Sequence, residues 1–62
     1  MKDKDVIQQA YEAALGAIFA AFVSAYTAAL GDKEKEDEAG AHFQKGVLHI
    51  RHIRDRALEL LQ

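Results

Sequence analysis

The chain has 62 residues and a mass of 6.9 kDa, half of its residues are hydrophobic, and its formal net charge at pH 7 is −2. This length holds one domain of two or three elements, which excludes a multidomain enzyme or a folded cofactor domain. Cysteine is absent, which excludes disulfides, thiolate metal sites and a cysteine nucleophile. The small net charge provides no overall attraction to nucleic acid or to anionic lipid.

The first predicted element is a helix over about residues 4–30. The chain contains no proline and is rich in alanine, leucine, glutamate and lysine, which favours helix. Asp5 precedes Gln8 by three residues, the spacing of a capping pair, and Asp3 is an alternative N-cap. The pair Gly31-Asp32 is typical of a helix end followed by the N-cap of a new helix.

Winding this helix at about 100° per residue divides its apolar residues into two groups. The first is a bulky face, made of Ile7, Tyr11, Leu15, Ile18, Phe19, Phe22, Tyr26 and Leu30. The second is a stripe of small residues, made of Ala10, Ala14, Ala17, Ala21, Ser24 and Ala28. The steps of four and three along this stripe are those of a coiled-coil seam.

The same helix contains a run of 19 residues without a charge, residues 13–31, which is nearly long enough to span a bilayer. Most of the run is alanine, so membrane insertion is marginal and we expect a buried helix of a soluble bundle. The first residues, Met-Lys-Asp-Lys-Asp, do not form a secretory signal. A cytoplasmic location is therefore expected.

The second predicted helix covers about residues 33–61. It has a single apolar seam with a polar opposite side, and the seam consists of Ala39, Phe43, Gly46, Ile50, Ile53, Ala57, Leu60 and Leu61. Two helices of equal length with a connection of two or three residues predict an antiparallel hairpin. In outline such a hairpin is similar to the repressor-of-primer family of small RNA-binding proteins, although no residue motif is shared.

The second helix is expected to cover only one of the two apolar faces of the first, which leaves the other face bare. A chain of this size also buries little apolar area on its own. The sequence therefore predicts an all-α, single-domain hairpin over residues 1–62 that forms a homodimeric four-helix bundle. The expected interface residues are Ala10, Ala14, Ala17, Ala21, Phe22, Ala28, Phe43, Ile50 and Ile53.

Histidines are the first group that could carry chemistry. His49 and His52 are three residues apart on a helix, so their rings could converge on a metal, with Glu38 or Asp55 adding an oxygen ligand. The spacing of a catalytic zinc helix and the Glu-x-x-His motif of di-iron bundles are both absent. We expect structural or solvated histidines and no cofactor, with metal binding or pH sensing as the alternatives.

The lysine and arginine side chains of the second helix are the second group that could carry a function. Lys45, Arg51, Arg54 and Arg56 could contact the phosphates of a nucleic acid. They could equally complement the helix dipole and pair with neighbouring acids. Arg54 lies at the shoulder of the apolar seam, where we expect it to reach an acid across the interface, with Glu12 and Asp5 as candidates.

The hydroxyl groups all lie in the first helix, and none is near a histidine in the sequence. No catalytic triad spacing follows from them, so we do not expect an enzyme. The expected function is that of a small oligomeric interaction or regulatory protein whose partner the sequence does not name. The alternatives are a nucleic-acid-binding regulator that uses the basic half of the second helix, and a histidine-based metal or pH-responsive site.

Overall fold

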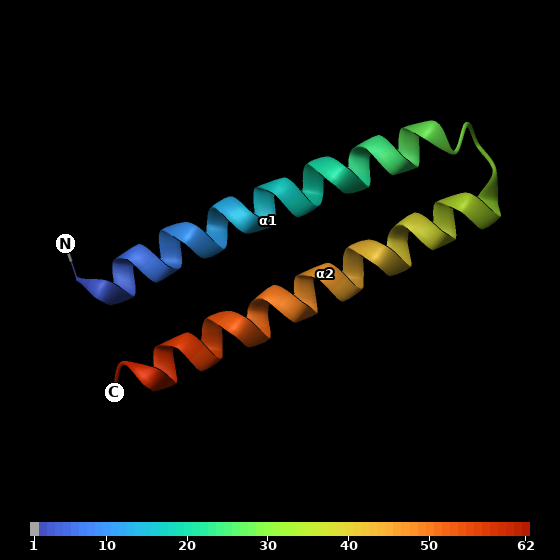
Figure 1. The fold of residues 1–62 in the computed structure, drawn as a ribbon. Coiled ribbons are helices and arrows are strands. Elements are labelled where there is room, and N and C mark those ends of the chain that lie inside the picture. The colour runs from blue at the N-terminus through green and yellow to red at the C-terminus, as the bar shows by residue number, and fades with distance from the viewer. Residues whose placement is uncertain (1) are drawn as a thin grey trace.

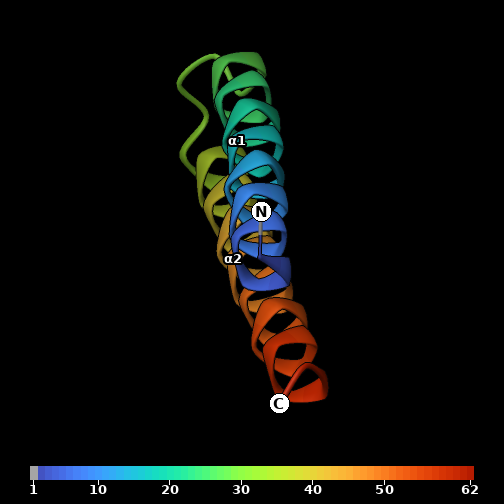
Figure 2. The same ribbon diagram turned by 90° about the vertical axis from the view of Figure 1, so that its left-hand side faces the viewer.

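The computed structural model describes residues 2–62 and contains two helices joined by a tight turn (Figure 1). Helix α1 comprises Asp3–Ala28 and helix α2 comprises Lys33–Leu60. The helices run antiparallel, so the start of α1 and the end of α2 lie at the same end of the hairpin, and the edge-on view shows one helix behind the other (Figure 2). The predicted all-α hairpin is confirmed. Its extents of 46 × 18 × 7 Å describe a single layer of two helices.

The turn between the helices uses the left-handed backbone conformation twice. Leu30 has a φ of 53° and Gly31 a φ of 83°. This conformation suits glycine but is uncommon for leucine, because the Cβ atom is crowded there. Helix α1 consequently ends at Ala28, two residues before the predicted end, and the Leu30 side chain is 90% exposed.

The two helices begin in different ways. Asp32 caps α2 as predicted: its Oδ1 atom accepts hydrogen bonds from the amides of Glu34 (3.0 Å) and Lys35 (3.3 Å). The predicted aspartate cap of α1 is wrong, because Lys2 holds the N-cap position and no side chain caps the helix. The two aspartates lie in the first turn of α1 instead, where a negative charge favours the helix dipole.

Replacing Asp32 by alanine should lower the free energy of unfolding by about 1 kcal/mol, because two amides at the start of α2 lose their acceptor. Urea unfolding followed by circular dichroism measures this loss. Asparagine at the same position keeps an acceptor oxygen and should restore most of the stability. An alanine variant as stable as the wild type would show that the cap contributes nothing.

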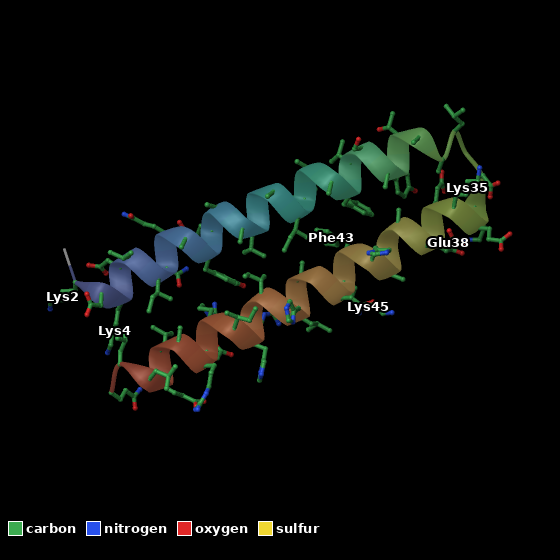
Figure 3. The ribbon with its side chains drawn as sticks, in the orientation of Figure 1. Lys2, Lys4, Lys35, Glu38, Phe43 and Lys45 are labelled. Carbon is green, nitrogen blue, oxygen red and sulfur yellow. The ribbon has the colours of Figure 1, made fainter. Side chains whose placement is uncertain are left out.

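The bulky face of α1 packs against the apolar seam of α2. The half-buried residues along this contact are Ile7, Tyr11, Leu15, Ile18 and Phe22 of α1 and Phe43, Gly46, Val47, Ile50 and Ala57 of α2. Phe43 lies between the helices (Figure 3), with its ring centroid 4.8 Å from that of Phe22. A Cβ atom on Gly46 would lie 3.3 Å from Ile18 Cγ2, so this glycine permits the close approach of the helices.

Burial within this seam is shallow. Among residues 2–62 only Ala29 and Ala39 are buried, and no large side chain is fully buried. Two helices that meet along one line exclude water only from the line itself. The hairpin therefore has an apolar seam but lacks the enclosed core that stabilises most domains.

Candidate interaction face

Three shallow apolar grooves between the helices open on one side of the hairpin. The groove nearest the turn is lined by Ala25, Ala28, Ala29, Lys35, Glu38, Ala39 and His42, the middle one by Ile18, Ala21, Phe22, Ala25, Ala39, His42, Phe43 and Gly46, and the third by Ile7, Ala10, Tyr11, Ile50, Ile53, Arg54 and Ala57. Ala10, Ala21 and Ala28 belong to one helical stripe, which places the grooves on the same side. We call this side, with the whole small-residue stripe of α1, the grooved face.

The α1 part of the grooved face is apolar and open to solvent. Ala10, Ala17, Ala21 and Ala28 are exposed, and Ala14 is half-buried. The stripe of small residues that contains them has no ionisable side chain. On the α2 part, the Ile53 side chain is 45% exposed. A surface of this kind allows another helix to approach closely without desolvating a charge on α1.

The predicted interface residues divide into two groups in the structure. Phe22, Phe43 and Ile50 are half-buried in the seam within the hairpin. The alanines and Ile53 contribute to the grooved face. The first group therefore joins the two helices of one chain and forms part of the groove walls, whereas the second group is mostly exposed on the grooved face.

The opposite side of the hairpin exposes larger side chains but also bears charge. Phe19 is 55% exposed, and Val23 and Tyr26 are each 45% exposed. Glu12 precedes Phe19 by two helical turns and therefore shares its side of α1. The negative charge of Glu36 raises the pKa of Tyr26 above its usual value. Docking on this side would remove water from Glu12 of α1, whereas the α1 part of the grooved face has no charged side chain to cover.

All three histidines are exposed, and only one of them lines a groove. His42 lines both the middle groove and the groove nearest the turn, whereas His49 and His52 line none of the three. Within residues 2–62, no group of three histidine, cysteine or carboxylate side chains is arranged to hold a metal ion. The pair at positions 49 and 52 therefore gains no further ligand from the described part of the chain.

Two of the three arginines of α2, Arg54 and Arg56, have partners within the hairpin. Arg54 Cζ lies 4.3 Å from the centroid of the Tyr11 ring, and Arg54 Nε donates to Asp55 Oδ1 at 2.9 Å. The expectation that Arg54 reaches Glu12 or Asp5 is wrong for this reason: the Tyr11 ring lies under the guanidinium, and Asp55 is the adjacent residue. Arg56 Nη1 lies 3.0 Å from Glu59 Oε2.

The cations also do not share one side of α2. Lys45 and Arg56 are eleven residues apart, about three turns, and lie on the same side, whereas Arg51 lies about 120° away around the helix. Arg54 is half-buried against α1. The four residues therefore do not make the continuous basic patch that contact with a nucleic-acid backbone requires.

The exposed area of the hairpin is large for its mass. Its accessible surface is 4902 Å², whereas a compact monomer of 6.9 kDa exposes about 4,000 Å². The difference of roughly 900 Å² is close to the 800 Å² or so that each partner buries in a standard protein interface.

Comparison of the chain with protein-family models, curated proteins and solved structures found no match. Helix α1 is long and apolar enough to cross a lipid bilayer by length and composition, a test that a signal sequence and the core helix of a soluble protein also pass. The grooved face, with its exposed apolar stripe, is therefore the candidate functional site of the hairpin.

Proposed function

We propose that the protein is a self-associating helical module without catalytic activity, in which two copies pair through their grooved faces into a four-helix bundle. The observation that carries this proposal is the combination of an uncharged, open α1 stripe with an exposed area that exceeds that of a compact monomer by about one interface. In the pair, the two stripes and Ile53 leave water together. The burial of this apolar surface drives the association.

Charge complementarity favours a second copy of the chain as the occupant of this face. Residues 32–38, at the start of α2, contain five acids and two lysines, whereas residues 45–56 contain four lysines and arginines and a single acid. In a face-to-face pair related by a two-fold axis perpendicular to the helices, the two α2 helices run antiparallel. The acidic start of each then lies toward the C-terminal half of the other, where Lys45 and Arg56 share one side of α2.

The same arrangement places the two α1 helices against each other. Each contributes the small-residue stripe, whose steps of four and three suit packing between helices that approach closely. The interface uses the same patch on both copies, so it closes at two subunits. A pair with both turns at the same end would instead place α1 against α2 and would leave the opposite charges of α2 apart.

Sedimentation equilibrium of the full chain at neutral pH without detergent tests the proposal. We expect twice the chain mass of 6.9 kDa at micromolar concentrations, and a thermal unfolding midpoint that rises with protein concentration because folding is linked to pairing. A stably folded single subunit at all concentrations would contradict the proposal. A chain that stays in solution only with detergent would point to a membrane location for α1 instead.

A further inference from the structure

We infer that protonation of His42 separates the two copies, so that self-association is controlled by pH. This inference rests on the proposed pairing through the grooved face. His42 lines two of the three grooves of that face. Its imidazole is therefore positioned where a second copy would remove water from it.

The surroundings of His42 favour the neutral imidazole once the face is covered. From α1, the groove residues around it are Ile18, Ala21, Phe22, Ala25, Ala28 and Ala29, none of which titrates. The charged groups near it on α2 are Lys35, Glu38 and Lys45. Glu38 and Lys35 line the same groove as His42, so their opposite charges largely offset each other beside the imidazole. Together they offset little of the cost of burying an imidazolium.

The second copy adds further positive charge. In the antiparallel arrangement, the basic half of its α2 lies toward His42, with its own Lys45 and His49 on the facing side. A protonated His42 would meet these like charges and would lose hydration at the same time. Pairing therefore disfavours the protonated imidazole, so the pair is favoured while His42 is neutral and is lost progressively as the pH falls and His42 takes up a proton.

The overall charge of the chain predicts the opposite dependence of pairing on pH. The formal net charge is −2 with neutral histidines, and protonation of all three histidines changes it to +1, because −2 + 3 = +1. The magnitude of the charge falls, so general repulsion between two copies would weaken on acidification. If pairing weakens as the pH falls, the cause is therefore the local environment of His42 and not the net charge of the chain.

The test compares the dissociation constants of the pair at about pH 8 and about pH 5.5. At the lower pH, histidine side chains are mostly protonated while carboxylates are still mostly ionised. The proteins are the wild type, His42→Gln and His52→Gln, with circular dichroism to establish that each is helical. His52 is exposed and outside the grooves, so it is the matched control. We expect the wild type and His52→Gln to bind at least about 10-fold more weakly at the lower pH, and His42→Gln to change little.

A wild-type dissociation constant that is the same at both pH values, or an unchanged pH dependence in His42→Gln, would overturn this inference and leave the pairing itself intact. Absence of a pair at about pH 8 would overturn the proposed function and this inference together.

Discussion

Replacing Phe43 by alanine should leave most of the chain unfolded. Phe43 is the only aromatic residue of α2, and its ring contacts those of Phe22, at 4.8 Å between centroids, and Phe19, at 6.4 Å. Removing a large aromatic side chain from a packed contact costs about 3 kcal/mol or more, including the loss of the aromatic pairs. A hairpin without an enclosed core has few other contacts to compensate.

Urea unfolding followed by circular dichroism measures this effect, and Leu48→Ala provides the control. The Leu48 side chain is 54% exposed on α2, so its truncation should lower the free energy of unfolding by about 0.5 kcal/mol or less. Equal unfolding midpoints for the two variants would mean that the aromatic contacts between α1 and α2 do not stabilise the hairpin.

Replacing Ala21 by glutamate should separate the proposed pair while leaving the hairpin helical. Ala21 lines the middle groove and is exposed in the hairpin, so a carboxylate there is hydrated in a single subunit. Pairing would bury two such charges without partners, at a cost of about 2 kcal/mol or more. We expect a dissociation constant raised at least about 30-fold in sedimentation equilibrium.

Ala20→Glu is the matched control for this variant. Ala20 is also exposed and has the same helix propensity, but it is rotated by about 100° and lines none of the grooves. It should therefore pair nearly as the wild type does. If Ala21→Glu and Ala20→Glu had the same dissociation constant as the wild type, the grooved face would not be the interface.

Much of the hairpin follows from local chemistry that the sequence displays. Gly31-Asp32 marks the turn, because glycine accepts the left-handed conformation and the aspartate oxygen caps the amides of α2. Leu30 was the exception: leucine rarely adopts a positive φ, and only closure of the turn imposes it. The start of α1 agrees with the prediction to within one residue, but its cap does not, because a cap depends on backbone geometry that residue spacing does not determine.

The site was harder to predict, because the sequence shows which faces are apolar but not which of them meet. Helix α2 could have covered either face of α1, and the structure places it on the bulky one. The helical pattern predicts Phe19 and Tyr26 on that face, yet they are about half exposed because the contact between two helices is narrow. For Arg54, charge alone suggested an acid on α1, whereas the Tyr11 ring and Asp55 are its neighbours.

The position of the two buried alanines affects how the hairpin folds. Ala29 and Ala39 lie beside the turn and line the same groove. Contacts there close a loop of only about ten residues, which loses little chain entropy and forms in less than a microsecond. Folding should therefore start at the turn, and the pairing of the two helices should then advance toward the termini. The last pairs to form are also the first to fray, so amide exchange should be fastest at the open end of the helices.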